Sequence, residues 1–237
     1  NSIRNNTINS TGEFLTNHGI YLLGDARNNS IVGNNVSIGY KGSSVGIYIN
    51  HNEATAQGVN EISSNTIKGF TEGSSQGIRV DGLSTDYFLA STTVNDNYVD
   101  MTSLSSSNNY GIRYNTYATS SNSIRRNTVI TNGTSTNYGI YVGTAQGVVI
   151  EGNFINTSSS DGNTIAKGSH AIILDTGAYS VDILNNTINS FNSSGIYSTR
   201  SVQTNLINNI TGNIITVTGN LSAVYQTSSS GFVANGT

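Results

Sequence analysis

The sequence predicts an all-β fold, a right-handed parallel β-helix (solenoid) of about eight coils that forms one domain over residues 1–237. Three observations support this prediction. Two short motifs alternate along the chain, one of them has the two-residue period of a β-strand, and the chain contains no proline. Proline lacks the N–H group that strand pairing needs, so its absence is typical of a chain built from strands and tight turns.

The first motif is I-x-x-N-x-I, with Val allowed at either end. Its apolar residues are five apart, as in Ile62 and Ile67, which breaks the alternation of a strand. A turn at the Asn would restore it, because Asn tolerates the left-handed backbone conformation. We expect the motif Asn residues at turns, several of them hydrogen-bonded between coils in a ladder. They are Asn6, Asn34, Asn65, Asn97, Asn127, Asn153, Asn186 and Asn213.

The second motif, Gly-Ile-Tyr-Ile in its fullest form, alternates with the first. Its apolar residues are two apart, so we expect them to face the interior while the Tyr faces outward. Stacked coils would place equivalent residues side by side in interior columns. One such column is Ile20, Ile47, Ile78, Ile112, Ile140, Ile172, Ile196 and Val224. Another is Ile8, Val36, Ile67, Val99, Val129, Ile155, Ile188 and Ile215.

Composition excludes several functions. Only 10% of residues are charged and the net charge is -3, so no basic surface is available and nucleic acid is not an expected partner. The absence of cysteine excludes disulfides and thiol catalysis. No apolar run approaches the ~18 residues that a membrane-spanning helix needs, so we expect no membrane insertion of this segment.

The alternating I-x-x-N-x-I and G-I-x-I motifs, which extend roughly from Ile3 to Gln226, resemble the repeats of the pectate-lyase-like superfamily of right-handed parallel β-helices. Similar repeats occur in carbohydrate-active enzymes and in bacterial and archaeal surface proteins. The resemblance implies a fold and leaves the activity open, because one fold hosts many functions. In enzymes of that superfamily the active site usually lies on the outer face of one sheet.

The outward residues of the Gly-Ile strands therefore contain the candidate catalytic group, Asp81 with Arg79 and Arg113. A glycosidase needs two carboxylates about 5–9.5 Å apart. The other outward acid, Asp175, is three coils away, or roughly 14 Å at the strand spacing. The resemblance also implies that a lyase would gather several carboxylates around calcium, and no second acid falls beside Asp81. We expect a solvated charge pair here and no catalysis.

The three histidines, His18, His51 and His170, do not form a metal-binding pattern. We expect them to be isolated turn or surface residues, and we expect no metal site and no cofactor.

An outward row of tyrosines and arginines is the more suggestive feature. Exposed aromatic rings on a flat sheet can stack against sugar rings or against another protein. Tyr also favours strands and stabilises stacked ladders, so a purely structural role is an equal alternative. The candidate binding residues are Tyr21, Tyr48, Arg79, Arg113, Tyr141 and Tyr197.

Asn-x-Ser/Thr sequons occur eleven times, and composition alone would give about nine, so they permit glycans without implying them. They begin at Asn5, Asn9, Asn28, Asn35, Asn132, Asn156, Asn185, Asn192, Asn209, Asn220 and Asn235.

These observations favour an extracellular or cell-surface solenoid with a structural or adhesive role, part of a surface layer, a fibre or an adhesin. The alternatives are a carbohydrate-active β-helix enzyme, a polysaccharide lyase or glycosidase, and a glycan-binding module. We expect the chain to be continued end to end by further repeats or by another copy, because Ile3 and Ile8 would otherwise lie in an open core. Glycans are the other expected partners.

Overall fold

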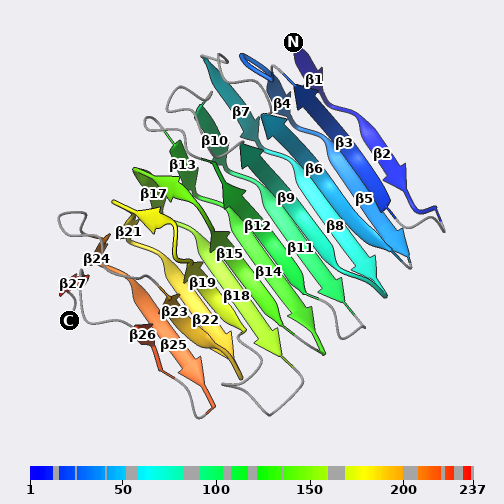
Figure 1. Ribbon diagram of the computed structural model, residues 1–237. Coiled ribbons are helices and arrows are strands. Elements are labelled where there is room, and N and C mark those ends of the chain that lie inside the picture. The colour runs from blue at the N-terminus through cyan, green and yellow to red at the C-terminus, as the bar shows by residue number, and fades with distance from the viewer. Residues whose placement is uncertain are drawn as a thin grey trace.

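The computed structural model is an all-β parallel solenoid in the part of the chain that it describes (Figure 1). Three long parallel sheets, here called sheets A, B and C, run the length of the stack, and each coil adds a strand to each sheet. Right-handed winding, a total of about eight coils and a single domain stay predictions from the sequence. The described residues are 1–12, 16–24, 26–40, 42–51, 58–82, 91–103, 108–116, 122–134, 136–159, 169–199, 208–219, 222–226 and 232–235.

Sheet A contains β1 (Ser2–Arg4), β4 (Ser30–Val32), β7 (Val59–Ser63), β10 (Ser91–Asn95), β13 (Asn122–Arg125), β17 (Val148–Glu151), β21 (Asp182–Leu184), β24 (Asn208–Thr211) and β27 (Phe232–Asn235). Sheet B contains β2 (Thr7–Ser10), β5 (Asn35–Tyr40), β8 (Thr66–Thr71), β11 (Tyr98–Ser103), β14 (Thr128–Gly133), β18 (Phe154–Ser159), β22 (Thr187–Phe191) and β25 (Ile214–Thr218). Sheet C contains β3 (Thr16–Gly24), β6 (Ser43–His51), β9 (Ser75–Gly82), β12 (Asn109–Asn115), β15 (Asn137–Val142), β19 (His170–Leu174), β23 (Ser194–Ser198) and β26 (Val224–Gln226). The short strands β16 (Ala145–Gln146) and β20 (Ala178–Tyr179) pair with each other between sheets C and A.

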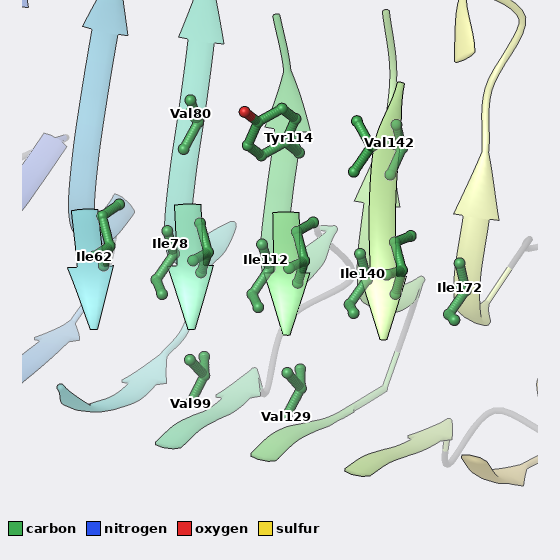
Figure 2. Close-up of a cluster of buried hydrophobic side chains, with 14 of the residues drawn as sticks. Ile62, Ile78, Val80, Val99, Ile112, Tyr114, Val129, Ile140, Val142 and Ile172 are labelled. Carbon is green, nitrogen blue, oxygen red and sulfur yellow. The ribbon is translucent and has the colours of Figure 1, made fainter. Parts of the chain in front are cut away.

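The register of sheets B and C confirms both interior columns predicted from the sequence. Ile78 pairs with Ile112, and Ile112 with Ile140, and the same alignment continues along sheet C from Ile20 to Val224. The second column follows sheet B from one coil to the next in the same way. Figure 2 shows these columns meeting in the interior, where the central side chains are fully buried.

The corner between sheets A and B is formed by the residue before each motif Asn. Ser64, Asp96 and Arg126 have positive φ angles of 56°, 58° and 53°. The residues before the other five motif Asn residues are also left-handed: Asn5, Gly33, Gly152, Asn185 and Gly212. Our expectation that the motif Asn itself takes the left-handed conformation was therefore wrong. The kink falls one residue earlier, which leaves the Asn side chain free to point into the stack.

The predicted Asn ladder is present, and it satisfies the backbone groups that each corner leaves unpaired. The Asn97 side chain accepts a hydrogen bond from the Asn65 N–H (3.0 Å) and donates one to the Ile62 carbonyl (2.9 Å), both on the preceding coil. It also accepts from the Asn65 amide and donates to the Asn127 side chain, each at 3.0 Å. All four hydrogen-bonding positions of this buried amide are thus used.

The same pattern extends from Asn6 to Asn213, with the acceptor oxygen always on the later coil. Polar pairs also occur at the other two corners. The buried Asn29 donates to Asn60 where sheet A begins, and Asn109 donates to Asn137 where sheet C begins.

The glycine that recurs at the start of the second motif has a steric cause. A Cβ on Gly139 would lie 2.5 Å from both the Ile155 side chain and the Ala171 carbonyl oxygen. The chain therefore passes close to the sheet B column at the start of each sheet C strand, which only a very small residue permits. Strand pairing in sheet C skips this glycine, and the residue before it is turned to the outer face.

We predict that Asn127→Leu destabilises the fold by about 3–5 kcal/mol, because it leaves the buried Asn97 N–H and Val94 carbonyl without partners. Chemical denaturation followed by circular dichroism measures this cost, and hydrogen exchange at the Asn97 amide localises it. Asn6→Leu is the matched control, because Asn6 is exposed and its loss should cost less than about 1 kcal/mol. Equal effects of the two variants would contradict the role given to the ladder.

Candidate functional site

The outer face of sheet C carries two adjacent rows of aromatic, histidine and arginine side chains, which we call the aromatic face. The row predicted from the sequence is Tyr21, Tyr48, Arg79, Arg113, Tyr141, Ile173, Tyr197 and Tyr225, in register from coil to coil. The second row is His18, Val45, Gln76, Tyr110, Tyr138, His170 and Ser194. The strands that carry both rows lie side by side along the stack (Figure 1).

The face begins with a stack over β3 and β6. The rings of Tyr21 and Tyr48 are parallel within 14°, with centroids 4.8 Å apart. His18 packs against both rings, at 5.0 and 5.5 Å. The Arg79 guanidinium lies over the far side of the Tyr48 ring at 4.5 Å, which adds a cation–π contact.

Three tyrosines and one arginine form the centre. Tyr110 and Tyr138 lie 5.0 Å apart, and Tyr141 meets the Tyr110 ring edge-on at 5.5 Å. The Arg113 guanidinium lies 5.8 Å from the rings of both Tyr110 and Tyr141. Among the residues that the structure describes, no carboxylate lies within ion-pair distance of Arg113, and these two rings are the groups its guanidinium faces.

The far part of the face is again a stack. His170 and Tyr197 are parallel within 1°, with ring centroids 4.0 Å apart, and Tyr197 stacks on Tyr225 at 5.4 Å. Tyr138 lies 6.0 Å from His170 and so joins this stack to the centre. The rings are fixed by their neighbours, which makes the face a preformed surface.

The expectation that the histidines are isolated turn or surface residues was wrong. His18 and His170 belong to the aromatic face, and His51 is fully buried beside Asn60 and Thr92. Sequence reasoning missed them because it carried the two-residue alternation through the glycine, where the structure interrupts it. The signal was present in the repeated placement of a ring or histidine directly before that glycine.

The candidate catalytic carboxylate, Asp81, is engaged by its neighbours. Its Oδ2 atom accepts a hydrogen bond from Arg79 Nε at 2.6 Å, forms an ion pair with the same guanidinium, and accepts from the Tyr48 hydroxyl at 3.1 Å. Burial, with the Asp81 charge as the second cause, raises the pKa of Tyr48 to about 12. Arg113 lies on the next strand beside Arg79, without an ion pair to Asp81 among the described contacts.

Asp175 has a similar environment without an arginine. It accepts hydrogen bonds from the Tyr141 hydroxyl (2.6 Å), the Thr176 N–H (2.7 Å) and the Thr199 hydroxyl (2.8 Å). Burial opposes its ionisation, yet these three bonds together lower the pKa of the Asp175 carboxyl below its usual value. The same arrangement thus occurs twice, in Tyr48 with Asp81 and in Tyr141 with Asp175. In each pair, a carboxylate on the next coil accepts a hydrogen bond from the tyrosine hydroxyl and so fixes the ring.

The positions of Asp81 and Asp175 suit a role in orienting tyrosine rings better than a role in acid–base catalysis, because the two carboxylates do not lie on adjacent strands. The residue aligned with Asp81 on the next strand is Asn115, and Asp175 lies on a later coil.

Among the described residues, no group of three or more His, Cys, Asp or Glu side chains could hold a metal ion. No helix in that same part of the chain is long and apolar enough to cross a membrane.

A shallow hollow of about 340 Å³ lies on a different face, the outer side of sheet B. Its lining combines the exposed ring of Phe70 with the oppositely charged Lys68 and Asp100. The hollow is local, whereas the aromatic face extends along the stack, so the two surfaces suit ligands of different shape.

Comparison with known proteins finds no match, whether with protein-family models, with curated proteins or with solved structures. The parallel solenoid therefore rests on the strand topology, and the pectate-lyase-like assignment stays a resemblance of motifs.

We predict that stability falls as the pH drops from about 6.5 towards 4, because burial lowers the pKa of His170 to about 4. The unfolded chain, with an ordinary histidine pKa, binds a proton in this window that the folded chain does not, which removes about 3 kcal/mol. Thermal melts across this pH range measure the loss. His170→Gln should flatten the profile, and an unchanged pH dependence in that variant would assign the loss to other groups.

Proposed function

We propose that this chain is an extracellular structural and adhesive solenoid without catalytic activity, and that the aromatic face is its adhesive surface. The observation that carries this proposal is the presence of two groups of packed rings on one sheet face. One group lies over β3 and β6 and ends at Arg79, and the other runs from β12 to β26 through His170. A binding surface whose side chains are already ordered loses little conformational entropy when a ligand docks.

Glycans are the ligand class that this surface fits best. Sugar rings present apolar C–H faces that stack on aromatic rings, and hydroxyl groups that hydrogen-bond to polar neighbours. The exposed rings of Tyr21 and Tyr225 at the ends of the face supply the stacking surface. Asn50, Asn115 and Thr199 supply polar groups in the outward row beside the rings. Arg113 would add attraction for an acidic sugar, because no described carboxylate neutralises it.

We predict that Tyr21→Ala and Tyr225→Ala, which remove the exposed rings at the two ends of the face, each weaken binding to immobilised polysaccharides by about 2- to 12-fold, the value of one aromatic stack. A panel of neutral and acidic polysaccharides, read by biolayer interferometry, provides the measurement. Tyr98→Ala is the control, because Tyr98 lies on sheet B away from this face. Binding that is equally strong in all three variants, or absent from the whole panel, would contradict the glycan proposal.

An enzyme of the pectate-lyase-like type is the second candidate, and the observation that favours it is the ion pair of Asp81 and Arg79 on an outer sheet face. An activity screen on the same polysaccharides decides between the two. Turnover that disappears in Asp81→Ala would establish the enzyme and overturn the adhesive proposal.

We also propose that the solenoid stacks end to end, with further repeats of its own polypeptide or with another copy. Each step of the Asn ladder places the acceptor oxygen on the later coil, so a coil before Asn6 would donate to it and a coil after Asn213 would accept from it. The two ends of the ladder are therefore complementary.

We predict that the 237-residue chain associates in a concentration-dependent way, which sedimentation velocity measures. Ile3→Asp and Ile8→Asp should reduce association, because both side chains pack at the edge of the core. Circular dichroism checks that the fold is kept in each variant. A chain that stays monomeric at all concentrations would contradict end-to-end stacking.

A further inference from the structure

The outer face of sheet B carries exposed phenylalanine rings beside an Asn-x-Ser sequon. Phe154 on β18 is 40% exposed and Phe191 on the neighbouring β22 is 51% exposed. Asn156, the first residue of the sequon Asn156-Thr157-Ser158, is exposed between them. Both rings leave apolar area in contact with water, which a group packed on them would remove.

Strand geometry places the sequon and the rings together. Phe154, Asn156 and Ser158 alternate with buried residues, so all three side chains project from the same face of β18. Asn156 pairs with Asn189, and Ser158 pairs with Phe191, which puts Phe191 diagonally across from Asn156. Such diagonal neighbours are ~7–8 Å apart, within the reach of one sugar ring.

The surroundings of Asn156 are neutral. Its partners on the two adjacent strands are Ile130 and Asn189, and no acidic or basic residue occupies β14, β18 or β22. No charged side chain on these three strands would repel or attract a group bound at this patch. The group that fits the patch is therefore neutral and has one apolar face.

We propose that Asn156 is an N-glycosylation site whose first sugar packs on the Phe154 ring. This inference rests on the extracellular location proposed above. In the reaction, Asn156 Nδ2 bonds to C1 of an oligosaccharide carried on a lipid diphosphate. The C1–O bond breaks, the diphosphate leaves with its electron pair, and the amide loses one proton.

Asn156 differs from the other ten sequons in having an aromatic residue two positions before it. Asn9 provides the matched comparison, because it is exposed, lies on sheet B and has Thr7 at that position. No sequon begins within a strand of sheet C, so glycans on sheet B would leave the aromatic face open.

The first test is site occupancy by mass spectrometry of glycopeptides. Protein isolated from its natural source and protein secreted from a eukaryotic cell line should both carry a glycan on Asn156. An unmodified Asn156 in the secreted protein overturns the site itself. A bare Asn156 on natural protein recovered from outside the cell overturns the glycosylation, whereas natural protein found inside the cell overturns the extracellular location.

The second test is the contact with Phe154. The glycan should raise the melting temperature by about 1–4 °C relative to Asn156→Gln. The rise should survive trimming to a single N-acetylglucosamine, because only the first sugar touches the ring. In a Phe154→Thr background the rise should vanish, together with the ring-current shifts of the sugar protons in NMR spectra.

Asn9→Gln serves as the control, because the glycan on Asn9 has no ring beneath it and should change the melting temperature little. A stabilisation that persists in Phe154→Thr, or that is equal at Asn9 and Asn156, overturns the proposed packing.

Discussion

The solenoid depends on one constraint, which is that every buried corner must satisfy the backbone groups that its kink removes from strand pairing. At the corner between sheets A and B, the kink frees a carbonyl group and an N–H group of each coil. The next coil supplies one Asn side chain that bonds to both, as Asn97 does for Ile62 and Asn65. No apolar residue could do this, and a charged one would be buried without a counter-ion. The recurrence of Asn at intervals of about thirty residues is therefore a requirement of the turn, and it fixes the register in which coils stack.

Once the corner fixes this register, the outside of the stack is ordered as strictly as the inside. Residues at equivalent positions lie one strand spacing apart, so a tyrosine repeated at one position becomes a row of stacked rings. The glycine at the start of each sheet C strand adds a second row, because it turns the preceding residue outward. The carboxylates Asp81 and Asp175 then hold two of the rings from the next coil. The aromatic face is in this sense a consequence of the core, and the residues of its two rows all lie on strands of sheet C.

The sequence was sufficient for the interior columns and insufficient for parts of the surface. The two-residue period and the repeated spacing of Ile and Val define which residues align, and the register follows from them. The left-handed corner residue was missed although the sequence carries a signal for it. The residue before the motif Asn is Gly, Asn or Asp in six of the eight motifs, and only Ser64 and Arg126 are types that rarely adopt this conformation. The roles of His18 and His170 were missed for a geometric reason, since the close approach of two sheets at the glycine interrupts the alternation. That approach depends on the volume of side chains from a distant part of the coil, such as Ile155 beside Gly139.

The orientation of the hydrogen bonds has a mechanical consequence. Strand pairing and the Asn ladder both join one coil to the next, whereas the covalent chain runs around each coil. A load along the long axis is therefore carried by the hydrogen bonds between one coil and the next. The three sheets share this force at each step. A load across the axis is carried by peptide bonds and a close-packed interior. Such a rod is stiff against bending and yields to tension one coil at a time, so a stretched molecule would lengthen in steps and dissipate energy at each of them.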